Sequence, residues 1–352
     1  MKIAIIADSH INGWRKSNSF FFYIEKAFDF FIEECEARDV EYIFVAGDTF
    51  HSKNEVAAEM LLHINSIIDK LRSKNRKVFL ITGNHDTFKK LDIEKNLLDI
   101  YKYFDGIKVV NTYEYIEIND TIIHMLPYYS GNVLIEKLNE INCFENKKNI
   151  LISPFGVNGF SLLQSELVDI HSYHETVSPK FLKKFNWVYL GHFHGHQTRG
   201  NITYVSSPFQ SRHGDEFGKH GFIFVDIDDH KFEFIENKYS PQYETIILSK
   251  NNLKEILIKE NMFLRLVVQE FINKDILHKI FKKLKNQNNT IKISSDFNKT
   301  LTIDKLATID GWEEIVYETP EDIIVGFIKK ISDEDIPNNI TKEELLEAMF
   351  ND

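Results

Sequence analysis

The chain has 352 residues, of which 43% are hydrophobic, and its formal net charge is −11. This length fits one large domain with a smaller one, and the composition excludes a disordered chain. The acidic balance disfavours a protein that coats nucleic acid through its overall electrostatic field, so we expect any contact with DNA to be local. No apolar run reaches the roughly 18 residues of a membrane span, and the N-terminal run meets charge too early for a signal peptide. We therefore expect a cytoplasmic protein that makes no membrane contact.

The first ninety residues alternate short apolar runs with longer amphipathic ones. The apolar runs at 2–8, 41–48 and 77–86 predict strands, and the amphipathic runs at 20–39 and 57–73 predict helices between them. This order indicates a βαβαβ unit. Each strand ends in polar residues, and the carboxyl edge of an open α/β sheet is where ligands bind.

The rest of the chain predicts two further parts. Residues 107–240 carry short strands and turns with a helical stretch at 161–169, which favours two stacked, mostly β layers with helices outside. We therefore expect one α/β domain over 1–240. Residues 241–318 predict a small α/β cap around a helix at 274–285, and 319–352 predict a tail of short amphipathic helices.

Polar side chains follow four of the predicted strands. Asp8 and His10 follow the first strand, Asp48 the second, Asn84 and His85 the third, and His192 and His194 a strand near 187–190. Alternate residues of a strand share a face, so D-x-H and H-x-H can each aim two side chains at one ion. Carboxylate, imidazole and amide ligands together suit a binuclear Mn, Fe or Zn centre rather than Mg or Ca. Two such ions promote attack on phosphorus, so the motifs predict phosphoester hydrolysis.

The motifs DSH, GD, GNHD and GHFH, in this order, resemble the calcineurin-like metallophosphoesterase superfamily. The resemblance implies a double β-sandwich flanked by helices. GNHD, GHFH and the later SSPFQ narrow it to the nuclease subunits of SbcCD-type double-strand-break repair complexes, the meiotic-recombination-eleven family, and most closely to the recombination endonuclease subunit of T4-like phages. It covers most of the chain, and it implies a nuclease domain at 1–240, a DNA-contacting cap at 241–318 and a partner-binding tail at 319–352.

The resemblance also implies roles for the site residues. The first ion would be held by Asp8, His10, Asp48 and His194, and the second by Asp48, Asn84, His192 and one further histidine. His85 would assist the transition state and the leaving group without binding an ion, and Asp86 would orient it. Two divalent ions are implied, with Mn²⁺ expected and Mg²⁺ as the alternative.

Pro154 stands where the resemblance predicts the further histidine, because the family motif is similar to GHFGVNG and this chain has SPFGVNG. Proline offers only its carbonyl oxygen to an ion. Three interpretations stay open. Water, His171 or His174 substitutes as a ligand; the second ion binds weakly and leaves cleavage slow; or the subunit has kept DNA binding and lost cleavage. Since the second ion loses a ligand, we expect reduced nuclease activity.

Two regions are predicted to contact DNA. Arg212 and His213 lie in the loop after the H-x-H strand and could line the phosphate path, with a solvated turn as the alternative. Lys279, Lys282 and Lys283 belong to the densest basic cluster of this acidic chain, on the helix at 274–285. They would neutralise backbone phosphates without reading sequence, unless they form an ordinary solvated face.

The acidic tail carries apolar residues at helical spacing, which favours docking in a partner groove over a self-packed helix. In the resembled family this segment binds an SMC-like coiled-coil ATPase, and helices corresponding to 55–72 and 91–104 form a homodimer. The resemblance thus implies a 3′–5′ exonuclease and endonuclease subunit that acts with an ATPase on double-stranded DNA ends in recombination, repair or replication, in association with the nucleoid. The alternatives are a catalytically weakened subunit that binds DNA and regulates the ATPase, and another binuclear phosphatase or phosphodiesterase.

Overall fold

The computed structural model describes residues 1–295 except 12–17, 53–55, 57, 90–91, 161–175, 230, 250, 269–271, 273 and 288. The chain divides into two units, Met1–Pro241 and the part from Gln242 onward. The predicted helical stretch at 161–169 and the tail at 319–352 lie outside the described residues. Of the helices in the described part, none is long and apolar enough to cross a membrane.

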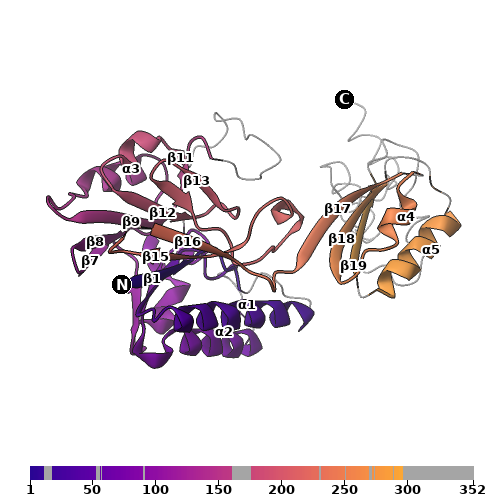
Figure 1. Cartoon of the computed structure of the whole chain (residues 1–352), viewed down its shortest axis with the longest axis horizontal. Helices are drawn as coiled ribbons and strands as arrows, with labels where there is room; N and C mark the ends of the chain where they lie inside the picture. The colour runs from indigo at the N-terminus through magenta and orange to yellow at the C-terminus, as the bar shows by residue number, and fades with distance from the viewer. Residues whose placement is uncertain are drawn as a thin grey trace, which may run out of the picture. The chain divides into compact units, whose positions relative to one another are not determined.

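The first sheet of unit 1 has the strand order β16-β15-β1-β2-β3-β6. Its strands are β1 (Lys2–Ile6), β2 (Tyr42–Ala46), β3 (Lys77–Ile81), β6 (Ile107–Val110), β15 (Gly221–Asp226) and β16 (Lys231–Glu236). β1, β2, β3 and β6 are parallel, and each of the first three buries four consecutive residues because both faces of the sheet are covered. The connecting helices α1 (Asn18–Ala37) and α2 (Ala58–Leu71) lie side by side outside this sheet (Figure 1).

The second sheet has the strand order β13-β14-β12-β9-β8-β7. Its strands are β7 (Glu114–Ile118), β8 (Thr121–Met125), β9 (Lys148–Pro154), β12 (Trp187–Gly191), β13 (Gln197–Arg199) and β14 (Ile202–Tyr204). Helix α3 (Gly131–Glu140) covers its outer face with Leu134 and Leu138. Short elements complete the unit: η1 (Ser73–Asn75), β10 (Gly156–Val157), β11 (Thr176–Val177), η3 (Pro179–Leu182) and η4 (His213–Asp215).

The two sheets pack face to face around a shared core. Ile5 and Phe44 of the first sheet and Ile150 and Tyr189 of the second are buried in one apolar cluster. Alternate strand residues supply this layer, as in other sandwiches. The predicted α/β fold, a double β-sandwich flanked by helices, is confirmed.

The predicted helix at 91–104 is wrong. Residues Asp92–Asn96 form β5, which pairs with β4 (Thr87–Lys89) as an antiparallel hairpin, and only Leu97–Tyr101 (η2) is helical, as a 3₁₀ turn. The backbone N–H of Leu97 donates to the carbonyl of Asp86 at 2.9 Å. This pairing gives backbone N–H and C=O groups next to the GNHD loop hydrogen-bond partners, and it overrides the local amphipathic pattern. The homodimer stays a prediction.

The described part of unit 2 forms a parallel three-stranded sheet with two helices. It consists of β17 (Gln242–Leu248), α4 (Leu253–Ile256), β18 (Met262–Val268), α5 (Lys274–Lys285) and β19 (Thr290–Ser295). Helix α5, which has the predicted bounds, buries Ile280 and Leu284 in the core of the unit. Lys279, Lys282 and Lys283 are exposed. The helix therefore has one apolar face and one basic face.

Candidate metal centre

The loops after β1, β2, β3 and β12 bring the predicted ligands together. The backbone N–H of His10 donates to the carbonyl of Asp48 at 3.0 Å, which joins the first two loops. The backbone N–H of His192 lies 2.9 Å from each carboxylate oxygen of Asp8, which joins the second sheet to the first. The candidate ligands therefore meet where the ends of the two sheets converge.

Several candidate ligands have strained backbone. The φ angles are 51° at Asp8, 41° at His10, 49° at Asp48 and 92° at His192. Positive φ is uncommon for residues other than glycine, and it persists only where the surrounding structure enforces it. The strand-end turns thus impose the orientation of these side chains, a feature found at functional sites.

Asp8, His10 and His194 form a compact group of possible ligands. One ligand atom from each lies within 4.8 Å of the others, and the two Nε2 atoms of the histidines are 3.2 Å apart. Asp48 Oδ2 lies 3.9 Å from His10 Nε2. Two imidazoles and two buried carboxylates are a donor set that suits Mn, Fe or Zn. The four residues predicted for the first ion therefore fit a metal.

Burial perturbs the protonation of this group. It raises the pKa of Asp8 to about 6. Burial, reinforced by the neighbouring His194, lowers the pKa of His10 well below its usual value. His10 is therefore neutral near pH 7, the state in which an imidazole can bind a metal. A cation between these groups would offset the cost of burying the Asp8 charge.

The residues predicted for the second ion are less completely assembled. Asn84 Oδ1 is buried and has no hydrogen-bond partner among the described residues, which leaves an amide oxygen for a cation. Asp48 Oδ1 accepts the backbone N–H of His85 at 2.9 Å. A Cβ at Gly83 would lie 2.1 Å from that oxygen, so only glycine allows this approach. In the described part of the chain, neither Asp48 nor His192 belongs to a group of three His, Cys, Asp or Glu ligand atoms within 4.8 Å.

Pro154 lies beside this incomplete group. It is the last residue of β9, and it pairs in register with Gly191, the residue before His192. Its ring packs on Gly47, because a Cβ at Gly47 would lie 2.3 Å from the Cβ of Pro154. The proline ring therefore occupies space next to Asp48 and contributes no side-chain ligand. The predicted substitutes, His171 and His174, lie outside the described residues.

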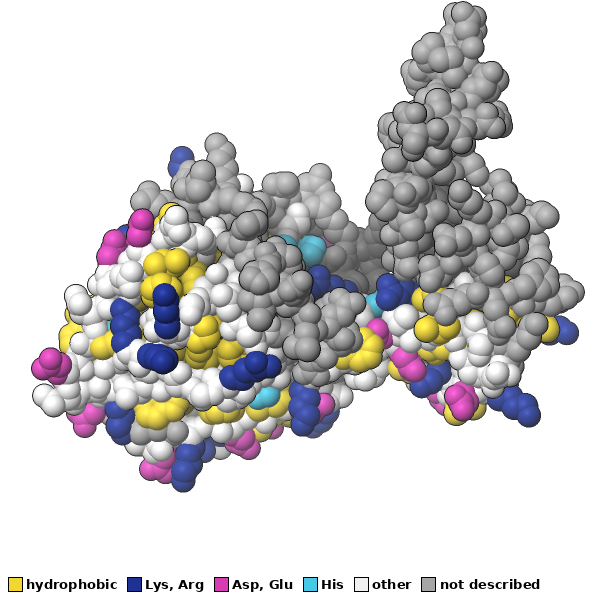
Figure 2. Space-filling view, turned by 90° about the horizontal axis from the view of Figure 1, so that it is seen from above, with side chains coloured by type: hydrophobic (Ala, Val, Ile, Leu, Met, Phe, Trp, Pro, Cys, Tyr) yellow, Lys and Arg dark blue, Asp and Glu magenta, His cyan; other side chains and the backbone are white. Residues whose placement is uncertain are grey.

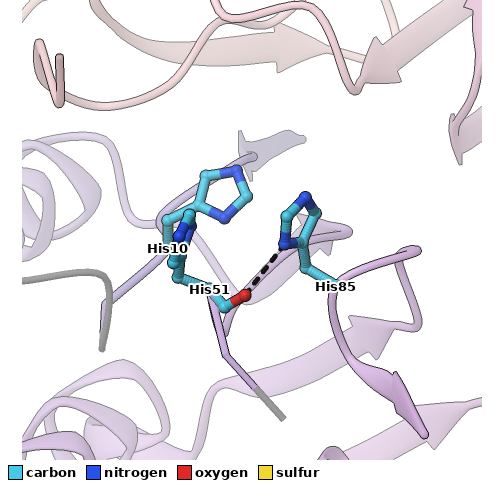
Figure 3. Close-up of side chains that lie close together, drawn as sticks. All are labelled: His10, His51 and His85. Atoms are coloured by element: carbon cyan, nitrogen blue, oxygen red, sulfur yellow. Dashed lines mark hydrogen bonds between the residues drawn. The ribbon is translucent and has the colours of Figure 1, made fainter. Parts of the chain in front are cut away.

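His85 is held by His51, a residue that the sequence motifs did not single out. The ring Nδ1 of His85 donates to the carbonyl oxygen of His51 at 2.8 Å (Figure 3). Since a carbonyl only accepts, Nδ1 carries the proton. His10, His51 and His85 form a second group with ligand atoms within 4.8 Å of one another. The sequence signal for His51 was its place three residues after Asp48.

Asp86 orders the loops beneath the site. It is fully buried, and its carboxylate accepts the backbone N–H groups of Phe50 and Gly83, both at 2.9 Å. Burial raises its pKa to about 6, although these hydrogen bonds oppose the shift. Asp86 thereby ties the GD loop to the GNHD loop. Its orientation of His85 stays a prediction, since the His85 ring donates its Nδ1–H to the carbonyl of His51.

The loop after β14 contacts the candidate ligand His194 through Asp215. His194 Nδ1 lies 3.2 Å from Asp215 Oδ1, and Arg212 Nε lies 3.4 Å from the same oxygen. Burial lowers the pKa of His194, but the Asp215 hydrogen bond and charge outweigh it, so the pKa is raised. The predicted Arg212 and His213 lie on this loop, whereas Asp215 was missed. The only sequence signal for Asp215 was its position in the same loop as Arg212 and His213.

Known proteins are similar to this chain over most of its length. The chain is 22% identical over 290 residues to Exonuclease subunit 1 of Enterobacteria phage T4, which covers 82% of this chain and 80% of that protein. It is 25% identical over 329 residues to the DNA double-strand break repair protein Mre11 of Methanocaldococcus jannaschii, covering 86% and 83%. It is 24% identical over an alignment of 390 positions to a subunit of the nuclease SbcCD of Staphylococcus saprophyticus, covering 99% of each.

A solved structure and a family model complete the comparison. A dimetal phosphatase from Danio rerio aligns with a TM-score of 0.43 and 10% identity, covering 64% of this chain and 92% of that one. Residues 1–200 match the family model described as calcineurin-like phosphoesterase. This span contains every candidate metal ligand in the sandwich. Because the match covers more than half of the chain, the chain belongs to the calcineurin-like phosphoesterase family.

Proposed function

We propose that the chain is a metal-dependent DNA nuclease subunit that hydrolyses phosphodiester bonds at double-stranded DNA ends. The observation that carries the proposal is the buried group of Asp8, His10 and His194, with Asp48 beside it. Similarity over most of the chain to proteins named as nucleases and as a double-strand break repair protein supports DNA as the substrate. The 3′–5′ exonuclease and endonuclease activity, two Mn²⁺ ions, a homodimer, and an SMC-like ATPase bound by the tail belong to the same proposal, as does action in the cytoplasm.

The side chains divide the chemistry among them. Asp8, His10, Asp48 and His194 would hold one ion, and Asp48, Asn84 and His192 would hold a second. When bound, such ions lower the pKa of water and neutralise charge that develops on the phosphate. His85, whose Nδ1–H is held by the His51 carbonyl, would act as an imidazolium: its Nε2, on the opposite side of the ring, gives its proton to the leaving oxygen, and the ring becomes neutral. The Arg212 side chain, 60% exposed beside the centre, binds a backbone phosphate.

The distribution of charge supports local DNA contact in an acidic chain. On the face of unit 1 in Figure 2, Lys and Arg side chains gather around exposed apolar ones, and acidic side chains lie mainly toward the margin. On α5, Lys279, Lys282 and Lys283 are exposed and make no ion pair within the described residues. Such cations are available to backbone phosphates.

Replacing Lys279, Lys282 and Lys283 together with glutamate is expected to weaken duplex binding about tenfold or more at moderate salt. Because up to three phosphate contacts would be lost, the slope of log affinity against log salt should flatten by as much as about 2.7. Glutamate and lysine have similar helix propensity, so α5 should persist. Fluorescence anisotropy across a salt series measures both effects, and a triple glutamine variant should be intermediate. If the parent and the glutamate variant bind duplex DNA with equal affinity at every salt concentration, α5 does not contact DNA.

The nuclease proposal is tested by comparing substrates in Mn²⁺. We expect cleavage of a labelled linear duplex and of bis-p-nitrophenyl phosphate, with much slower hydrolysis of the monoester p-nitrophenyl phosphate. His85→Ala should reduce duplex cleavage about 10²-fold or more, since it removes the proton donor. A preference for the monoester would support a phosphatase instead. The assay is repeated with the ATPase partner, because Pro154 also favours a second candidate: a weakly cleaving subunit that binds DNA and regulates the ATPase.

A further inference from the structure

Asp215 is a buried carboxylate directly behind a candidate metal ligand. Its side chain is 1% exposed. Its Oδ1 lies 3.2 Å from His194 Nδ1 and 3.4 Å from Arg212 Nε. Its Oδ2 accepts the backbone N–H of Ser211 at 2.9 Å and the Ser211 hydroxyl at 2.7 Å. Four donors therefore converge on one carboxylate and fix its position.

These contacts suit a negatively charged carboxylate. The hydrogen bonds from His194 and Ser211 and the nearby Arg212 guanidinium offset the cost of burying it. A buried anion with satisfied oxygens can accept a strong hydrogen bond from imidazole.

The backbone of Asp215 is anchored on a second side. His220 Nε2 donates to the Asp215 carbonyl at 2.8 Å, and His220 Nδ1 lies 2.9 Å from Ser207 Oγ. His220 and Ser207 are both buried, so neither can face DNA. The anchor holds the backbone from which the Asp215 carboxylate projects toward His194 and Arg212.

We propose that Asp215 is a positioning residue that aligns the metal ligand His194 and the phosphate-binding Arg212 from a single fixed carboxylate. The hydrogen bond keeps the proton on Nδ1 of His194, so Nε2, which faces His10 Nε2, carries the lone pair that a metal requires. The same oxygen retains Arg212 at the edge of the centre. The part that concerns Arg212 rests on the proposed function, whereas the part that concerns His194 rests on the metal centre alone.

Asp215→Asn is expected to weaken Mn²⁺ binding about 10- to 100-fold, the usual effect of losing a carboxylate behind a histidine ligand. The electron paramagnetic resonance signal of free Mn²⁺ measures this affinity without DNA. In the metal-free chain, at a pH where the His194 ring is neutral, ¹⁵N shifts of the imidazole should report Nδ1–H in the parent and a mixture of tautomers in the variant. In cleavage assays, Arg212→Ala should reduce the rate by a smaller factor in the Asp215→Asn background than in the parent, because the two residues are coupled.

Two further variants separate positioning from general stability. Ser207→Ala alters the same loop on the far side of His220, and it should lower the melting temperature without changing Mn²⁺ affinity. Ser211→Ala removes one hydrogen bond to Asp215 Oδ2 and should weaken Mn²⁺ binding a few-fold. This variant still tests the proposal if Asp215→Asn does not fold. Unchanged Mn²⁺ affinity and tautomer in Asp215→Asn, or an equal loss in Ser207→Ala, would overturn the proposal. A parent that binds Mn²⁺ but does not cleave DNA would overturn the proposed function instead.

Discussion

Replacing Asp8 with asparagine is expected to lower Mn²⁺-dependent duplex cleavage about 10³-fold, which corresponds to roughly 4 kcal/mol of transition-state stabilisation. Asp8 supplies a buried carboxylate to the group that contains His10 and His194. Asparagine keeps the size of the side chain and an oxygen for the backbone N–H of His192, but it removes the negative charge. Initial rates at saturating Mn²⁺, compared with those of the parent, give the effect.

The same variant should leave the metal-free fold intact. Burial raises the pKa of Asp8 to about 6, because desolvation makes its negative charge costly in the absence of a cation. The melting temperature of metal-free Asp8→Asn should therefore equal or exceed that of the parent, whereas Mn²⁺ should stabilise the parent more than the variant. Retention of more than about a tenth of the parental rate, a loss under about 1.4 kcal/mol, would contradict the assignment of Asp8 as a ligand.

The convergence of the candidate ligands could be predicted because each lies at a place that local sequence determines. Asp8, Asp48 and His192 each come at or just after the end of a short apolar run, and neighbouring parallel strands bring such positions together at one edge. No detail of loop geometry is needed for that inference. The βαβαβ order and the sandwich follow from the same alternation of apolar and amphipathic runs.

Residues that approach the centre through loops could not be predicted in the same way. The contact of Asp215 with His194 depends on how the loop after β14 folds back, and the contact of His51 with His85 passes through a backbone carbonyl. Neither contact produces a periodic pattern in the amino-acid sequence. The hairpin at 87–96 was likewise missed, because pairing with a neighbouring strand overrides helical periodicity in a short segment.

Replacing Pro154 with histidine is expected to raise Mn²⁺-dependent cleavage about tenfold or more and to add a second tightly bound Mn²⁺ per chain. Position 154 pairs with Gly191 next to His192, and the proline ring packs on Gly47 next to Asp48. An imidazole there would join Asn84 Oδ1, which is buried without a partner among the described residues. Cleavage of a labelled duplex and Mn²⁺ stoichiometry by electron paramagnetic resonance measure the two effects.

Pro154→Ala separates the gain of a ligand from the loss of the proline ring. Alanine keeps the Cβ that lies nearest Gly47 but removes the rest of the ring, including Cγ; it restores a backbone N–H and supplies no metal ligand. A gain in the histidine variant alone would identify the missing ligand as the cause of slow cleavage. Equal rates in all three chains at saturating Mn²⁺ would mean that another group completes the second site. If the parent only matches the His85→Ala blank while the histidine variant cleaves, the natural chain binds DNA ends through a disabled centre, and its role lies in regulating the complex.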